Sequence, residues 1–233
     1  MKEKICYNCG IPLTSDIATV EHVPAKNLYE GFGDEYKVNR ITVPACFDCN
    51  NLYSKIDQEI RDALAVKSDD PQQKQDLTGK GVRSILRRSN WSDRTHFNNN
   101  GQVVAVAFNY GDLRQLHIKN FKALFFRKYG FPVPENFIID IIADGDDDKI
   151  ETAQILHDYL RIDKEFEHSG HPDIFKFILK DLTPDIPNDT IFESGDFDKL
   201  VGVAGLLVYH DDIGAVIVAG KKDFVESCKP KQK

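Results

Sequence analysis

The sequence lacks any apolar run that approaches the roughly 20 residues of a transmembrane helix. It also lacks a secretory signal, because the charged residues 1–4 run almost directly into a cysteine, so a cytoplasmic protein is expected. Internal repeats and low-complexity segments are absent, which excludes repeat architectures. An excess of positive charge is missing as well, since the net charge is −7. This balance argues against a protein coated with nucleic acid and leaves room only for a local basic surface.

What remains is typical of a soluble globular chain. The 233 residues are 41% hydrophobic and 29% charged, enough for one large domain or two small domains with a real core. Cysteines are few, and their number, five, is odd. Without a secretory signal, their paired spacing indicates metal binding in a reducing compartment and not a disulfide framework. Cys228 is left over and is expected to be a free thiol without a role.

The four other cysteines form two Cys-x-x-Cys knuckles, and they are Cys6, Cys9, Cys46 and Cys49. Two close pairs of thiolates are typical of a closed, tetrahedral, structural zinc site. Thirty-six residues separate the two knuckles, so a substantial insert is expected to extend from the metal. The alternative interpretation is a structural zinc site that only holds a small domain together and has no catalytic role.

Three predicted elements surround the knuckles. Residues 18–23 and 40–44 favour strands, and residues 50–66 favour a helix with apolar side chains at helical spacing. The order knuckle, strand, loop, strand, knuckle, helix predicts a treble-clef-like module over residues 1–66. Residues 67–100 are polar and predict a connector that contains a short basic helix around residues 82–89.

Residues 101–233 predict a second domain of alternating strands and helices, so the fold class is α+β. The expected strands are 102–110, 137–143 and 175–179, the expected helices are 112–129 and 148–164, and residues 200–209 and 215–219 are expected to form a C-terminal hairpin.

Within residues 5–66 the chain resembles the HNH endonucleases, which share the ββα-metal nuclease fold. The resemblance rests on the first knuckle, the run Glu21-His22-Val23-Pro24 and the run Val43-Pro44-Ala45-Cys46-Phe47-Asp48-Cys49-Asn50-Asn51. It implies that His22 is the general base and that Glu21 and Asn50 bind a divalent cation. Glu21 stands where Asp is commoner, and Asn50 where His is commoner. The family has a further Asn between the two strands, and Asn39 is the nearest candidate for it in this chain.

The chemistry of phosphodiester hydrolysis fits these residue types. A neutral imidazole can deprotonate water, and a hard cation on oxygen ligands, Mg²⁺ or Mn²⁺, relieves charge on the leaving oxygen. Adjacent strand residues point to opposite faces, so Glu21 and His22 serve one phosphate only if the strand ends or bends, for which Pro24 is a candidate cause. Asp57 is expected to be a further cation ligand or to orient one, with a surface carboxylate as the alternative.

A basic stretch follows the zinc module. Arg83, Arg87 and Arg88 lie at spacings that put two guanidinium groups on one helix face, and Trp91 comes just beyond. Arginines that contact phosphates beside an aromatic side chain that stacks on bases form a nucleic-acid surface. Lys55 is a further candidate phosphate contact. The alternative for this stretch is a solvated helix face.

These observations predict a metal-dependent HNH-type endonuclease that hydrolyses phosphodiester bonds in DNA. The C-terminal domain is then expected to supply specificity, homo-oligomerisation or regulation. Two alternatives stay open. One is a non-catalytic zinc-knuckle protein that binds nucleic acid, and the other is a protein-interaction domain in which the nuclease site is degraded.

Overall fold

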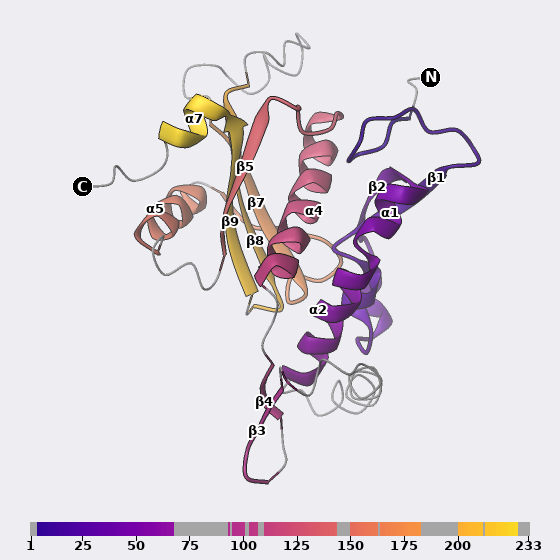
Figure 1. Cartoon of the computed structure of the whole chain (residues 1–233), viewed down its shortest axis with the longest axis vertical. Coiled ribbons are helices and arrows are strands. Elements are labelled where there is room, and N and C mark those ends of the chain that lie inside the picture. The colour runs from indigo at the N-terminus through magenta and orange to yellow at the C-terminus, as the bar shows by residue number, and fades with distance from the viewer. Residues whose placement is uncertain are drawn as a thin grey trace.

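The structure is a computed structural model, and it describes residues 4–67, 93, 95–100, 103–106, 110–143, 150–162, 164–182, 200–211 and 213–227. Within these residues the chain is a mixed α/β protein whose strands all pair antiparallel (Figure 1). No helix in this part of the chain combines the length and the apolar content that crossing a membrane requires.

The N-terminal part is built on a two-stranded hairpin of β1 (Ala18–Val23) and β2 (Ile41–Cys46). The bounds predicted for the first strand are confirmed. Two short 3-10 helices, η1 (Lys26–Tyr29) and η2 (Asp34–Lys37), lie in the connection between the strands.

The single helix predicted for residues 50–66 is instead two helices, α1 (Phe47–Leu52) and α2 (Ser54–Lys67). Cys46 caps α1, because its sulfur accepts the backbone N–H of Cys49, and the helix therefore starts before residue 50. Tyr53 leaves the helical region at φ −101°, ψ 2°, and this turn separates the two helices.

A five-stranded sheet forms the C-terminal part. Its spatial order is β5-β9-β8-β7-β6, with β5 at Phe137–Ala143, β6 at Glu167–His168, β7 at Phe175–Asp181, β8 at Gly202–Tyr209 and β9 at Ile213–Lys221. The predicted strand 137–143 and the C-terminal hairpin are confirmed. A separate small hairpin pairs β3 (Thr95–Phe97) with β4 (Val103–Val106), and α7 (Lys222–Ser227) follows β9.

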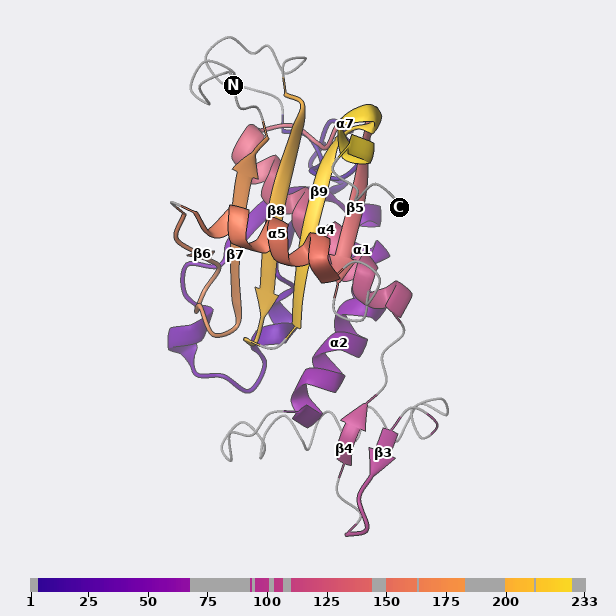
Figure 2. The ribbon, with the colours of Figure 1, turned by 90° about the vertical axis from the view of Figure 1, so that its left-hand side faces the viewer.

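Helices cover both faces of this sheet. Helix α4 (Tyr110–Tyr129) lies on one face and α5 (Ile150–Arg161) crosses the other (Figures 1 and 2). Alternate residues of the central strands serve the two faces: Phe177 and Leu207 belong to the core on the α4 side, whereas Ile178 and Leu206 pack with Leu160 of α5. Burial on both faces explains why these strands are nearly all apolar.

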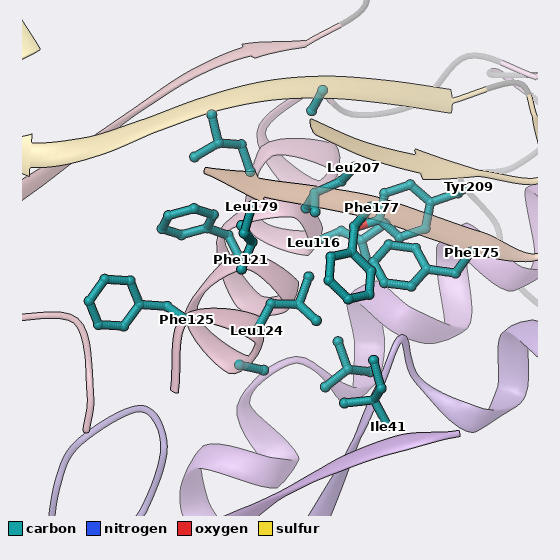
Figure 3. Close-up of a cluster of buried hydrophobic side chains, with 14 of the residues drawn as sticks. Ile41, Leu116, Phe121, Leu124, Phe125, Phe175, Phe177, Leu179, Leu207 and Tyr209 are labelled. Atoms are coloured by element: carbon teal, nitrogen blue, oxygen red, sulfur yellow. The ribbon is translucent and has the colours of Figure 1, made fainter. Parts of the chain in front are cut away.

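Helix α4 is also the link between the sheet and the N-terminal hairpin. It contacts β1, β2 and α2 on one side and β5 and β8 on the other. One hydrophobic core runs from Tyr7 and Ile41 through Leu116 and Phe121 of α4 to Phe175 in the sheet (Figure 3). The predicted zinc module therefore shares its core with the C-terminal part of the chain.

Candidate metal centre and active site

The four knuckle cysteines converge at one place. Their Sγ atoms all lie within 4.8 Å of one another, and the Sγ atoms of Cys9 and Cys46 are 3.8 Å apart. Zn–S bonds of about 2.3 Å in a tetrahedron separate neighbouring sulfurs by about 3.8 Å. The quartet is therefore placed to hold a zinc ion. In the described part of the chain it is the one group of three or more His, Cys, Asp or Glu side chains so arranged.

Local backbone structure explains this convergence. The N–H of Tyr7 donates to the carbonyl of Pro44 at 2.9 Å, which ties the first knuckle to β2 just before the second. Burial opposes ionisation of the Cys6 thiol, but backbone hydrogen bonds from Cys9, Cys46 and Asn8 outweigh it and lower its pKa to about 7. A thiol that ionises near neutral pH is suited to bind a metal as the thiolate.

Helix α4 supports the cysteine cluster from outside. Asn8 donates its side-chain N–H to the Cys49 sulfur at 3.4 Å, and the Lys122 ammonium donates to the Asn8 side-chain oxygen at 3.1 Å. Burial lowers the pKa of Lys122, while the nearby Cys49 opposes that shift. Sequence reasoning did not anticipate Lys122, because its partner lies 114 residues away along the chain.

Glu21 and His22 sit side by side on β1 and face opposite ways. The strand continues through both, with Glu21 opposite Val43 and His22 opposite Thr42 of β2. Only 4% of Glu21 is exposed, whereas His22 is half-buried. The strand does not end between them, so the two side chains serve different faces of the hairpin.

On the buried face, Glu21 belongs to a cluster of charges. The Lys119 ammonium of α4 lies 3.1 Å from Glu21 Oε1 and 2.6 Å from Asp57 Oδ2. All three residues are buried, with exposures of 4%, 6% and 1% for Glu21, Asp57 and Lys119. Burial raises the pKa of both carboxyl groups, and Lys119 opposes the shift in each. The structure thus brings together two predicted cation ligands around an ammonium group.

Each carboxylate in this cluster keeps one oxygen without a partner. In the part of the chain that the structure describes, no group donates a hydrogen bond to Glu21 Oε2 or to Asp57 Oδ1, and both atoms are buried. Two phenols border the cluster: the Lys119 ammonium is 5.9 Å from the centre of the Tyr53 ring, and the Glu21 charge contributes to the raised pKa of Tyr7. The main cause of that shift is burial of the phenol.

His22 lies on the other, more open face among positive charges. Burial is the main reason that its pKa is lowered, and Arg40, Lys26 and Lys119 lower it further. This shift favours the neutral form of the imidazole. Arg40 is held in turn by Tyr29, over whose ring its guanidinium lies at 5.6 Å.

Two other predicted site residues lie on the helices that follow the second strand of the hairpin. Asn50 is half-buried in α1 and Lys55 is exposed on α2. Asn39 sits in a turn at φ 55°, where its carbonyl accepts the N–H of Gly170 at 3.4 Å. Arg83, Arg87 and Arg88 lie outside the described residues.

A C-terminal loop before β7 clamps the hairpin. The buried Ser169 hydroxyl accepts the backbone N–H of Ile41 at 2.9 Å, and the Tyr29 hydroxyl donates to the Ser169 carbonyl. Next to it, Gly170 has φ +65°, and a Cβ there would lie 2.6 Å from the carbonyl oxygen of Tyr36. The close approach of the two segments therefore requires glycine at this position.

Sequence reasoning missed Lys119 and Ser169, although the position of Lys119 in the sequence offered a signal. Lys119 falls on the apolar side of α4, three residues after Leu116 and four before Ala123, both fully buried. A charged residue at such a position indicates a buried partner of opposite charge. For Ser169 the sequence holds no comparable signal.

Comparison of the chain with known protein families, with curated proteins and with solved structures finds no match.

Proposed function

We propose that this protein is an HNH-type endonuclease that hydrolyses phosphodiester bonds in DNA, with His22 as the general base. The observation that carries the proposal is the setting of His22. Its imidazole is half-buried, has a lowered pKa and lies near the positive charges of Lys26 and Arg40, on a hairpin joined to a cysteine quartet. A neutral imidazole beside phosphate-binding charges is what base-assisted hydrolysis requires.

The arrangement around the quartet supports a treble-clef-like, ββα-metal module with a structural zinc ion. The hairpin of β1 and β2 leads directly into the second knuckle, and α1 starts at the residue after Cys46. In this proposal zinc fixes the hairpin and takes no part in the reaction.

A second, hard cation fits the buried face of the hairpin. Glu21 Oε2 and Asp57 Oδ1 are acceptors without partners, and carboxylate oxygens are the ligands that Mg²⁺ and Mn²⁺ prefer. Glu21 and Asp57 would hold the cation; Asn50, the other ligand predicted from the sequence, is half-buried in α1. When bound, such an ion would neutralise the two buried carboxylates and fix the hairpin, because it would lie on the face of β1 opposite to His22.

The residues of the chain supply the other parts of the reaction. His22 takes a proton from water, whose oxygen forms a bond to phosphorus. The opposite P–O bond breaks, and the leaving oxygen takes up a proton from solvent, which yields a phosphate monoester and an alcohol. Arg40 and Lys26 bind the phosphate oxygens through their charges. Tyr29 keeps the Arg40 guanidinium oriented.

A plasmid-cleavage assay tests the role of His22. His22→Ala is expected to lower the cleavage rate by about 10²–10⁴-fold, because loss of a general base costs that much, while the far-UV circular dichroism spectrum stays the same. His157→Ala is the matched control, since this histidine lies on α5, which covers the face of the sheet away from α4 and the hairpin, and the variant should cut at the wild-type rate. Equal rates for wild type and His22→Ala would refute the proposal.

One observation favours a second candidate, a zinc-knuckle protein that binds nucleic acid without cutting it. Glu21 has an ammonium partner 3.1 Å away and faces away from His22 on β1, so a cation held by Glu21 would not lie beside the base. In that case the wild-type protein would bind DNA in a mobility-shift assay and leave a plasmid intact at any concentration of Mg²⁺ or Mn²⁺.

A further inference from the structure

The buried cluster of Glu21, Asp57 and Lys119 brings two carboxyl groups and one ammonium group together in a place shielded from water. Taking charges out of water is costly, and such groups persist only when they neutralise one another. The shared ammonium does this incompletely, because one oxygen of each carboxylate is left without a partner. The cluster therefore has spare acceptor capacity for a cation.

We infer that Lys119 is an internal substitute for a divalent cation, holding Glu21 and Asp57 together until a metal ion displaces it. The identity of the ion, Mg²⁺ or Mn²⁺, rests on the proposed function. Lys119 is added here as the residue that competes with this ion. Asp57, on α2, becomes the second carboxylate of the cation site.

Geometry supports this competition. The ammonium lies 2.6–3.1 Å from one oxygen of each carboxylate, so it bridges the two acids as a bound ion would. An ion that used the same carboxylates would lie within a few ångströms of the ammonium and be repelled by it. Lys119 has a long, flexible side chain, and withdrawal of its ammonium is the rearrangement that frees both carboxylates.

Replacement of Lys119 by methionine tests this inference. Lys119→Met removes the ammonium and keeps an unbranched apolar chain. Two buried carboxylates are then without a counter-charge, so the variant should unfold at a lower temperature than wild type in EDTA-treated buffer that spares the zinc. Added Mn²⁺ should restore stability, with an affinity at least about tenfold tighter than that of wild type. At a hundredfold excess over Kd, the unfolding midpoint should rise by about 5–10 °C.

Lys128→Met is the matched control. Lys128 is another α4 lysine, and its ammonium lies 2.6 Å from Asp181, a buried single carboxylate. This variant should also lose stability, but Mn²⁺ should not restore it, because only one acid is freed. Zinc content, measured by elemental analysis, should be one ion per chain in every variant.

The response of each variant to Mn²⁺ decides whether the inference holds. A Mn²⁺ response of Lys119→Met equal to that of wild type or of Lys128→Met would overturn the inference. Should Lys119→Met fold in neither buffer, the double variant Lys119→Met, Asp57→Asn decides, because it buries one charge fewer and keeps an oxygen ligand at residue 57. Its midpoint should rise with Mn²⁺ by more than that of wild type, and an equal rise would overturn the inference. All these measurements omit DNA, so their failure is distinct from a failure of His22 to catalyse cleavage.

Discussion

Ser169 offers a direct measure of how firmly the C-terminal loop holds the hairpin of β1 and β2. Its hydroxyl accepts the backbone N–H of Ile41, the first residue of β2, at 2.9 Å, in a place from which water is excluded. Ser169→Ala removes this acceptor, but the backbone bonds of residue 169 to Phe175 and Tyr29 can remain. The Ile41 N–H would then be buried without a partner.

A buried polar group left unpaired costs about 1–3 kcal/mol. We therefore expect Ser169→Ala to lower the free energy of unfolding by that amount. For a chain of this size, each kcal/mol shifts the melting temperature by about 2–4 °C, so the expected decrease is about 2–12 °C. The m-value should not change, because the folded and unfolded states expose the same surface as before.

Urea denaturation followed by far-UV circular dichroism measures this difference. Thr42→Ala, at the neighbouring exposed position of β2, is the control and should stay within about 0.5 kcal/mol of wild type. A free energy of unfolding for Ser169→Ala that also lies within about 0.5 kcal/mol of wild type would show that the loop does not stabilise the hairpin through this bond.

Three further predictions concern other parts of the chain. Wild-type protein should contain one zinc ion per chain by elemental analysis, and replacing all four knuckle cysteines by serine should abolish zinc binding and unfold the hairpin; a fully folded variant would contradict this. His117 is fully buried with a pKa lowered to about 3, so the unfolded chain binds one more proton between pH 6.5 and 3. Below pH 6.5 the free energy of unfolding of wild type should therefore fall with pH more steeply than that of His117→Leu, by about 1.4 kcal/mol per pH unit. Urea titrations that show the same pH dependence for both proteins would refute this. Removing the charges of Arg83, Arg87 and Arg88 should reduce the slope of log K for DNA binding against log salt by about 0.9 for each phosphate that the protein no longer neutralises, and an unchanged slope would identify a solvated face.

Much of the secondary structure follows from local pattern. Residues 18–23 and 137–143 have the bounds predicted from the sequence, the second from its Ile and Phe content, and the cysteine spacing predicts the quartet that the structure brings within 4.8 Å. The strands depend on neighbours a few residues away. The quartet depends on thiolate pairs, which bind few kinds of ligand other than a metal ion. The break at Tyr53 was missed, because a buried aromatic residue at a helix junction is set by tertiary packing.

The candidate site was predictable only in part, for a related reason. The order of residues along β1 identifies Glu21 and His22, but which of them is buried depends on α4, nearly a hundred residues later. The pairing of Lys119 with Glu21 and Asp57 joins three elements far apart in the sequence. No periodicity within a single segment specifies such a pairing.

The position of α4 in the chain also bears on the order of events during synthesis. A ribosome releases the four knuckle cysteines, Glu21 and Asp57 well before it releases Lys119. A nascent chain that has emerged only as far as α2 already holds the four cysteines, yet its two acidic side chains have no ammonium between them and the apolar side of its hairpin is uncovered. Exposed apolar surface of this kind is where partly made chains aggregate. Emergence of α4 therefore supplies both the missing charge and the missing cover, and it does so in a single helix.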